Sequence, residues 1–537
     1  MNSYGVWVIS LALLYTLALI IVGNVAKRKA GRGEQYFIGG RTFRWWTVAF
    51  CITGLFSGST YISIVELSYL TGISAIWYGV AETLQVLLIA LLLIKSFREK
   101  LIVTITGLIG DQFGRRAKAL SGAITAFAFP MWSVATAIAF ASAFHVFTGV
   151  SLSLSVAFTA LLLFVYLQSG GMWAVAFTQT MNTIIFALMF IIGAAAFFIK
   201  PGISGLQQLA VEQPGMFDWD GAGLQVILVW FATFLVNVIL AQAAFQMALS
   251  CRTPEEGQKG LIVAEVMSIP FILFGILFGL SAAAVVPDAS LGLIALPRYL
   301  MGVLPAPLVG MFFLGIWACA LGWGAPCQFS GATSLGKDVG SAIFPDASPE
   351  KLVTYTKWSL LLLTGLMIVF GFLRTEQSAW WNVLAWTMRN SATFAPVVAA
   401  LFWPLVTKRA VLGSLFGGFT AGLLWYHLSN WHPSDFFLNI HPVWVGMSVN
   451  ILTMIVFTVV FSYGTWKISA ATPVKSSIIL GTVVVLLAVN GYFYETLHAA
   501  GVIGLTLFLN VLAVFIGSIM FIKPKSATMV TKKEVVS

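Results

Sequence analysis

Charged residues are scarce in this chain. Only 9% of its 537 residues are Asp, Glu, Lys or Arg, whereas ordinary soluble domains carry roughly 25%. The hydrophobic share is 59% and the mean hydropathy is +0.95. A water-soluble surface cannot be built from this composition, which excludes a soluble globular protein. Apolar runs of about 20 residues recur instead, and each is long enough to cross a hydrocarbon core as a helix.

Cysteine is also scarce, and the regions between the apolar runs are short. The four cysteines lie in or beside apolar runs, so no disulfide framework is expected. The loops reach only about 20 residues, too few for a soluble domain with its own core. The first run, residues 4–26, has no basic stretch before it and no small-residue cleavage site after it. We therefore expect a retained helix there rather than a signal peptide.

The net charge of +10 is distributed as in a membrane protein. No basic face with interleaved aromatic residues is formed, so nucleic acid is not an expected partner. We predict an all-α polytopic membrane protein with about fifteen transmembrane helices. The expected spans are residues 4–26, 44–72, 75–96, 118–148, 151–168, 174–199, 223–248, 259–286, 303–334, 352–373, 380–406, 410–429, 442–464, 476–495 and 499–522.

Basic residues alternate between the two sets of loops. Of the 29 Lys and Arg residues, 25 lie in one set, while the other set holds only Lys200, Arg298 and Arg374. Because Lys and Arg collect in cytoplasmic loops, the sequence predicts an outside N-terminus and a cytoplasmic C-terminus. The expected location is the cell membrane, crossed many times.

The middle of the second span is unusually rich in small and polar residues. It reads Gly54-Leu55-Phe56-Ser57-Gly58-Ser59-Thr60, where a lipid-facing helix would carry Leu and Val. A helix broken at this depth exposes carbonyl and amide groups, which is tolerated only beside a cavity and creates substrate and ion sites. Close helix packing through small residues is the alternative interpretation.

Four separated segments resemble the sodium:solute symporter family, in the family's order. They are Thr104-Ile105-Thr106-Gly107 with residues 111–116, the Gly170-Gly171 pair within residues 166–179, Gln246 with residues 251–260, and residues 401–418. The resemblance implies a leucine-transporter-type fold, with two inverted five-helix repeats and a site at their interface. The implied parts are an N-terminal helix and basic cytoplasmic loop (1–43), a first repeat (44–200), a second repeat (201–407), and additional C-terminal helices with a short cytoplasmic tail (408–537).

The resemblance also implies a sodium site, and this chain departs from it. Family members hold sodium with backbone carbonyls that correspond to Gly54 and Ser57, and with hydroxyls in the ninth span. Those hydroxyl positions fall on Gly322 and Trp323, or on Trp323 and Gly324, and none of these residues has a hydroxyl. Hard cations need several oxygen ligands, so a weakened sodium site is predicted.

Ionisable residues within the predicted spans are the other candidates for function. Glu66, Glu82, Glu265 and Arg389 each cost about 2.5–3.5 kcal/mol or more at the bilayer centre, which makes a functional role the default hypothesis. Arg389, beside Asn390, suits a substrate carboxylate or phosphate, or else pairs with a buried glutamate. Glu82 is either a proton carrier or a structural charge.

These observations give one set of candidate residues. The family's frequent acidic residue after its signature Thr is Gln179 here, which removes a negative charge. Predicted substrate contacts come from Phe56, Ser57, Ser59, Thr60, Gln242, Arg389 and Asn390. Predicted coupling-ion contacts come from Gly54, Ser57, Glu82 and Gln179. The histidines at 427, 432 and 441 fit no tight metal-binding spacing, so no metal site is predicted.

The predicted function is secondary active import of a small polar organic solute by alternating access. A carboxylate-bearing solute is favoured because of Arg389. The coupling ion is Na⁺ at a weakened site, H⁺, or none, and no other cofactor is expected. A passive channel or a transporter-like sensor is the alternative, and an enzyme is not expected. The expected partners are the solute and membrane lipid, without an obligate protein partner.

Overall fold

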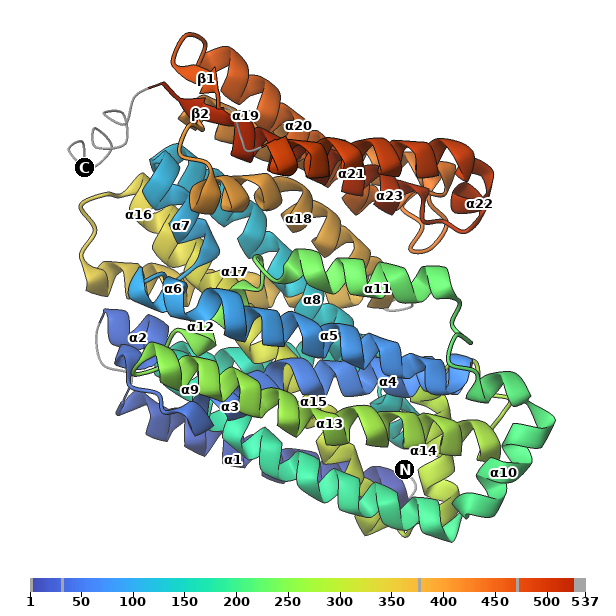
Figure 1. Ribbon diagram of the computed structural model, residues 1–537. Coiled ribbons are helices and arrows are strands. Elements are labelled where there is room, and N and C mark those ends of the chain that lie inside the picture. Colours follow the sequence, from blue (N-terminus) through green and yellow to red (C-terminus); the bar gives the residue numbers. More distant parts are fainter. Residues whose placement is uncertain (1–2, 30–32, 375–377, 470–472, 526–537) are drawn as a thin grey trace. The chain divides into compact units, whose positions relative to one another are not determined.

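The computed structural model describes residues 3–29, 33–374, 378–469 and 473–525 (Figure 1). Nearly all of its regular structure is helical. The α-helices are α1 (Ser3–Lys27), α2 (Glu34–Ile38), α3 (Trp45–Ile52), α4 (Gly58–Thr71), α5 (Ile76–Leu88), α6 (Ile94–Glu99), α7 (Ile105–Phe113), α8 (Arg115–Thr148), α9 (Leu152–Ile199), α10 (Gly202–Glu212), α11 (Leu224–Asn237), α12 (Gln242–Ala248), α13 (Pro254–Val285), α14 (Gly292–Val303), α15 (Ala306–Thr333), α16 (Gly340–Ile343), α17 (Pro349–Leu373), α18 (Ser378–Phe402), α19 (Lys408–Leu428), α20 (Pro442–Phe461), α21 (Pro473–Tyr492), α22 (Tyr494–Ala499) and α23 (Ile503–Phe521).

Tighter or wider helical turns and two short strands complete the described chain. The 3₁₀ segments are η1 (Gly39–Arg41), η3 (Gly72–Ala75), η5 (Pro214–Phe217) and η7 (Phe437–Asn439). The π segments are η2 (Thr53–Ser57), η4 (Ile89–Leu93) and η6 (Ser334–Val339). Strands β1 (Trp466–Ile468) and β2 (Ile522–Pro524) pair antiparallel, with Lys467 opposite Lys523.

The all-α, multi-pass architecture is confirmed, but the count of about fifteen spans is not. Eleven helical segments of the described chain are long and apolar enough to cross a membrane, or twelve when the bent pair α11 and α12 is taken as one span. Two of the eleven, Trp45–Glu99 and Leu152–Ile199, have 55 and 48 residues, and each contains two of the spans predicted from the sequence. The α18 helix, which contains Arg389, is not among the eleven.

Both long segments change direction at a glycine. Gly171, inside α9, has φ 53° and ψ −136°, and Gly72, after α4, has φ 70°. A β-carbon at Gly171 would overlap the Tyr36 carbonyl, and one at Gly72 would overlap the Met216 carbonyl. Only glycine combines a positive φ with such close backbone approach. A straight helix of 48 residues would measure about 72 Å, more than twice the hydrocarbon thickness, so these bends are needed.

The chain divides into two compact units. The first unit comprises Met1–Thr104, Phe129–Lys337 and Ala347–Trp381. Within it α1, α9 and α15 pack against one another, and α13 packs against α3 and α4. Trp317 of α15 is fully buried, and its ring stacks on Phe140 and Phe158 at centroid distances of 5.4 and 5.8 Å. This aromatic core holds α15 in a fixed position.

The second unit comprises Ile105–Ala128, Asp338–Asp346 and Asn382–Ser537. Its α19 packs on α20, and both α20 and α21 pack on α23. Pro396 lies inside α18 and cannot donate the usual helical hydrogen bond to the carbonyl of Ala392. Asn450 of α20 replaces it, because its Nδ2 donates to Ala392 O at 2.8 Å while its Oδ1 accepts from Ala395 N at 2.7 Å.

Candidate functional site

The second predicted span widens at its centre. Between α3 and α4 the helix passes through the π turn η2, Thr53–Ser57, and its backbone stays in the right-handed helical region on both sides. The chain is thus wide-turned here rather than interrupted, which differs from the broken helix considered from the sequence. Single π turns inside α-helices occur frequently at functional sites. The small residues that suggested a break permit close packing, since a β-carbon at Gly58 would lie 3.1 Å from Cys319 Cα.

The clear break lies instead in the seventh predicted span. The α11 and α12 helices meet at 51°, and residues 238–241 between them are not helical. The prediction of one continuous helix over residues 223–248 is therefore wrong at this point. Two amide side chains, Asn237 and Gln242, flank the break within an otherwise apolar run and were the available signal.

Gln179 lies where the η2 turn meets α15. Its Nε2 donates to the Gly322 carbonyl at 2.7 Å, and the side chain is fully buried. A β-carbon at Gly54 would overlap Gln179 Oε1, and a β-carbon at Gly322 would overlap the Gly54 carbonyl. Gly54 and Gln179, two of the predicted coupling-ion contacts, are therefore in direct contact with Gly322, where the expected hydroxyl is missing.

Proline explains why an amide is needed at this point. Pro326 lies inside α15, four residues after Gly322, and has no N–H to donate to the Gly322 carbonyl. Gln179 Nε2 supplies the missing donor. Because a buried carbonyl without a partner costs about 1–3 kcal/mol, this hydrogen bond stabilises α15 at its proline.

A chain of hydrogen bonds extends from Gln179 to α1. Asn182 Nδ2 donates to Gln179 Oε1 at 3.0 Å, and the Tyr15 hydroxyl donates to Asn182 Oδ1 at 2.5 Å. All three side chains are buried. The chain joins α1, α9 and α15 through neutral groups only. It fixes the orientation of the Gln179 amide and so directs its N–H at the Gly322 carbonyl.

The other predicted residues of the second span differ in their environments. Phe56 packs edge-to-face on Trp323 of α15, with ring centroids 6.3 Å apart. Ser57 is buried, and the Ser59 hydroxyl donates to the Phe56 carbonyl at 3.1 Å. The Thr60 hydroxyl is buried without a hydrogen-bond partner in the described chain. Such groups are rare in folded proteins, which favours Thr60 among these residues as a contact for a ligand.

Gln242, at the start of α12, hydrogen-bonds to α15. Its Nε2 lies 3.1 Å from Ser330 Oγ and 2.7 Å from Ser334 Oγ. One turn later, Gln246 Nε2 donates to Thr333 Oγ1 at 3.0 Å and to the Phe37 carbonyl at 3.1 Å. These amides secure the helix after the break to α15.

Two carboxylates lie close together between α5 and α13. Glu82 and Glu265 are both buried, and each is near enough to the other for electrostatic interaction. Both residues were candidates from the sequence, and Glu82 was predicted as a coupling-ion contact without being paired with Glu265. The pairing could not be seen from spacing, because the two residues lie 183 positions apart and depend on the packing of α5 on α13.

Gln85 is a candidate that the sequence analysis missed. Its side chain is fully buried, and neither its amide oxygen nor its nitrogen has a hydrogen-bond partner within the described residues. Gln85 lies on the same face of α5 as Tyr78, seven residues earlier, whose ring packs on Phe234 of α11 at 5.1 Å.

The α5 and α11 helices pack on each other and run in the same direction, which fixes the height of Gln85 along α11. Near their first residues, Trp77 Nε1 donates to the Trp219 carbonyl, and beyond their ends Arg98 Nε donates to the Cys251 carbonyl. Two turns beyond Tyr78, Gln85 is therefore level with the break after Asn237. The amide of Gln85 and the hydroxyl of Thr60 are both buried without a hydrogen-bond partner among the described residues.

Arg389 and Asn390 belong to the second unit. Arg389 has 5% of its surface exposed, and its Nε donates to Asn390 Oδ1 at 3.0 Å. The Thr393 hydroxyl donates to the Arg389 carbonyl at 2.8 Å. The role of these two residues in substrate binding stays a prediction.

Comparison with known proteins identifies the family. A model described as the sodium:solute symporter family matches residues 36–418. The chain belongs to the sodium:solute symporter family. The resemblance found from the four sequence segments is thereby confirmed.

Relatives of this chain are distant in sequence. The sodium/glucose cotransporter of Vibrio parahaemolyticus is 24% identical over 450 residues, covering 74% of this chain and 81% of that protein. The sodium/pantothenate symporter of Escherichia coli (strain K12) is 22% identical over 476 residues, covering 82% of this chain and 94% of that protein.

A solved structure establishes the fold of this chain. A Na⁺-coupled sialic acid symporter in a substrate-bound outward-open state matches with a TM-score of 0.71 and 16% identity, covering 86% of this chain and 98% of that chain. The leucine-transporter-type fold is therefore confirmed. At this identity the match shows only the fold. The identity of the solute and of the coupling ion has to be inferred from the residues of this chain.

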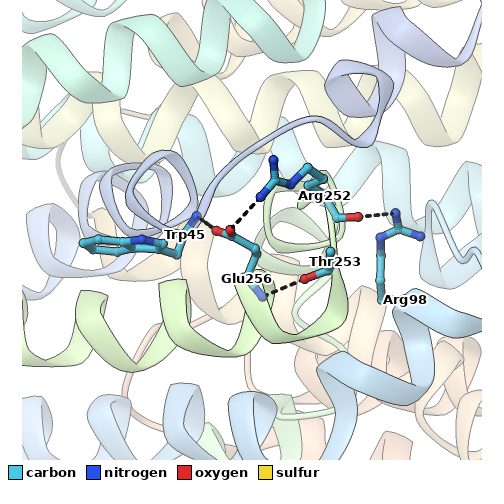
Figure 2. A network of polar contacts seen from close by, with 5 residues as sticks. All are labelled: Trp45, Arg98, Arg252, Thr253 and Glu256. Atoms are coloured by element: carbon cyan, nitrogen blue, oxygen red, sulfur yellow. Dashed lines mark hydrogen bonds and ion pairs between the residues drawn. The ribbon is translucent and has the colours of Figure 1, made fainter.

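A polar network joins the beginnings of α3 and α13 in the first unit. Figure 2 shows Glu256 accepting a hydrogen bond from the Trp45 backbone N–H and pairing with Arg252, whose Nη2 lies 3.4 Å from Glu256 Oε1. Thr253 caps α13, because its Oγ1 accepts from the Glu256 N–H at 3.3 Å. Arg98 Nη2 donates to the Arg252 carbonyl at 3.2 Å. The start of the wide-turned span is thus tied to the turn that follows α12.

Replacing Glu256 by alanine should loosen this connection measurably. The Trp45 N–H at the start of α3 would lose its acceptor, and we expect the free energy of unfolding in detergent to fall by about 1–2 kcal/mol. Glu255, the exposed neighbour, provides the matched control, and its replacement by alanine should change stability by less than about 0.5 kcal/mol. Equal losses in the two variants would show that the network does not hold α3.

The histidines of the second unit do not gather at a metal site. Within the described residues there is no group of three or more His, Cys, Asp or Glu side chains arranged to hold a metal ion. His441 instead caps α20, since its Nδ1 accepts from the Val443 N–H at 3.2 Å. Burial lowers the pKa of His441 to about 4, which keeps the ring neutral and able to accept this hydrogen bond.

Proposed function

We propose that this symporter-family chain imports a small polar organic solute by alternating access without using sodium at the Gly54–Gly322 position. Membership of the family and the transporter-type fold support secondary transport. The observation that carries the proposal about coupling is the buried Gln179 amide, which contacts both glycines. The alternative of a passive channel or sensor is not supported by the relatives found.

The Gln179 amide occupies the position where a sodium ligand would be needed. A sodium ion needs several oxygen ligands, and the Gly322 carbonyl freed by Pro326 would be one candidate. That carbonyl accepts a hydrogen bond from Gln179 Nε2 at 2.7 Å instead. The amide hydrogen thus provides partial positive charge where an ion would otherwise be needed, and no carboxylate is present in the contact to attract one.

Glu82 and Glu265 support proton coupling as the alternative to sodium. Two carboxylates held together in an apolar setting are suited to taking up and releasing a proton. Gln85 lies one turn from Glu82 on α5, so a polar solute bound by Gln85 would lie near the pair. Proton-coupled or uncoupled transport is therefore proposed in preference to sodium coupling.

The class of solute and the orientation are proposed from charge. The buried guanidinium of Arg389 favours a solute that carries a carboxylate, because its planar fork suits bidentate recognition. The distribution of Lys and Arg favours an outside N-terminus and a cytoplasmic C-terminus. The proposal also includes two inverted repeats, which comprise residues 44–200 and 201–407.

Uptake into proteoliposomes tests the proposal. Purified protein is given labelled carboxylates and neutral solutes under an inward sodium gradient, an inward proton gradient, or neither. We expect accumulation with the proton gradient, or equilibration without any gradient, and at most a twofold or so effect of sodium. Accumulation that requires sodium would overturn the coupling proposal. Glu82→Gln and Glu66→Gln form a matched pair, and only Glu82→Gln should remove the proton dependence.

A further inference from the structure

Three cations of the first unit lie over aromatic rings near the beginnings of α3 and α13. Lys29 Nζ lies 5.0 Å from the centroid of the Trp173 ring, the Arg44 guanidinium lies 5.0 Å from that of Trp46, and Lys259 Nζ lies 4.6 Å from that of Trp45. These six residues are called the basic aromatic band. None of these six residues is among the proposed contacts for the solute or the coupling ion.

The band is continuous although its members come from four helices. The Phe43 ring bridges two parts of it, because it packs edge-to-face on Trp173 at 4.8 Å and directly precedes Arg44 in the chain. The Trp45 and Trp46 rings lie 6.1 Å apart and connect Arg44 to Lys259. Figure 2 shows the Trp45 side chain extending away from the Arg252–Glu256 pair, so the band and that network use opposite sides of Trp45.

The helix ends place the band at headgroup level. Lys27 ends α1, Trp45 begins α3 and Pro254 begins α13. Trp173 follows the Gly171 bend of α9 by two residues. Tryptophan and basic residues at span ends mark the interface between hydrocarbon and water.

The charge of the band is not neutralised by the protein. Lys29, Arg44 and Lys259 are exposed, and no carboxylate of the described residues forms a salt bridge with any of them. Lys27 and Arg28 add two further exposed cations at the end of α1. The first turn of α13 carries Glu255 and Glu256, of which Glu256 is already paired with Arg252.

We propose that the basic aromatic band binds the headgroup of an anionic phospholipid. Exposed cations over half-buried or exposed rings keep their outward N–H groups available for phosphate oxygens, while the accessible parts of the rings pack against the glycerol region and the first acyl carbons. A zwitterionic headgroup offers no net charge to match the three cations. The lipid would rest against the ends of α1, α3 and α13 and hold the start of the wide-turned span at the membrane surface.

Lipid titration of the full-length protein in detergent tests the assignment. The midpoint of thermal unfolding is followed against dioctanoyl phosphatidylglycerol, dioctanoyl phosphatidylcholine and inorganic phosphate at equal ionic strength. We expect saturable stabilisation by phosphatidylglycerol, with apparent binding at least about tenfold tighter than for phosphatidylcholine. Equal stabilisation by the two lipids would overturn the proposal. Equal stabilisation by inorganic phosphate would overturn the choice of a lipid.

Charge-matched variants locate the site. The combined variant Lys29→Gln, Arg44→Gln, Lys259→Gln should weaken phosphatidylglycerol binding about tenfold or more. The control Lys95→Gln, Lys100→Gln, Lys351→Gln removes the same charge from exposed positions outside the band and should retain binding. If the first variant folds poorly, Lys29→Arg with Lys259→Arg keeps charge and ring contact and should bind as the parent does. Equal losses in the two charge-removing variants would show that only overall charge matters.

Discussion

Replacing Gly322 by alanine should abolish uptake and lower the free energy of unfolding by about 3 kcal/mol, the upper part of the range for overpacking. The new methyl group would overlap the Gly54 carbonyl and lie 3.3 Å from Gln179 Oε1. The overlapping atom belongs to the backbone of the wide turn, so no side-chain rotation can relieve the contact. The turn and α15 would have to separate, which would also lengthen the hydrogen bond from Gln179 to the Gly322 carbonyl. Thermal unfolding in detergent and uptake into proteoliposomes measure the two effects.

Gly324 provides the matched control in the same helix. A β-carbon there would lie 3.0 Å from Leu163 Cδ1, the end of a flexible side chain that can move aside. Gly324→Ala should therefore unfold within about 1 kcal/mol of the parent and retain most of its uptake. Equal losses for both alanine variants would mean that α15 is sensitive to helix substitutions in general. A stable and active Gly322→Ala variant would contradict the contact between η2 and α15.

The fold could be predicted well from the sequence, because hydrophobic length is a local property. The long apolar runs, the scarcity of charge and the four family-like segments depend on residues close together in the chain. The breaks were harder to place. The glycine-rich centre of the second span was compatible with either a broken helix or close packing, and it only widens at Thr53–Ser57. The break at residues 238–241 carries no glycine at all. Small residues report close packing as readily as a broken helix, and only the tertiary structure separates the two.

The candidate site was predicted in part. Gly54, Gln179 and Gly322 were each selected from the sequence, the last as a position that lacks a hydroxyl. What could not be predicted is that Gln179 meets both glycines, since the three residues come from different helices. The proline signal was nevertheless present. Pro326 frees the Gly322 carbonyl as Pro396 frees that of Ala392, and in each unit a buried amide, Gln179 or Asn450, donates to the freed group.

The contrast between Gln179 and Gln85 makes the sharpest prediction about function. Gln179 is buried with both ends of its amide hydrogen-bonded, whereas Gln85 is buried with neither end bonded. Burial of an unpaired amide costs stability, so folding alone gives no reason for Gln85 to be polar. We expect Gln85→Leu to unfold at or above the parent temperature while uptake falls at least about tenfold, the loss expected when about 1.4 kcal/mol of binding is removed.

Gln179→Leu should behave in the opposite way. It would leave the Gly322 carbonyl and Asn182 Nδ2 without partners in the protein interior, at about 1–3 kcal/mol each. The free energy of unfolding should therefore fall by about 2–5 kcal/mol, and any loss of uptake should follow the loss of folded protein. Paired measurements of thermal unfolding and of uptake per folded molecule distinguish the two glutamines. If Gln85→Leu lost stability and kept full uptake per folded molecule, Gln85 would be structural, and the solute site would have to lie away from the break between α11 and α12.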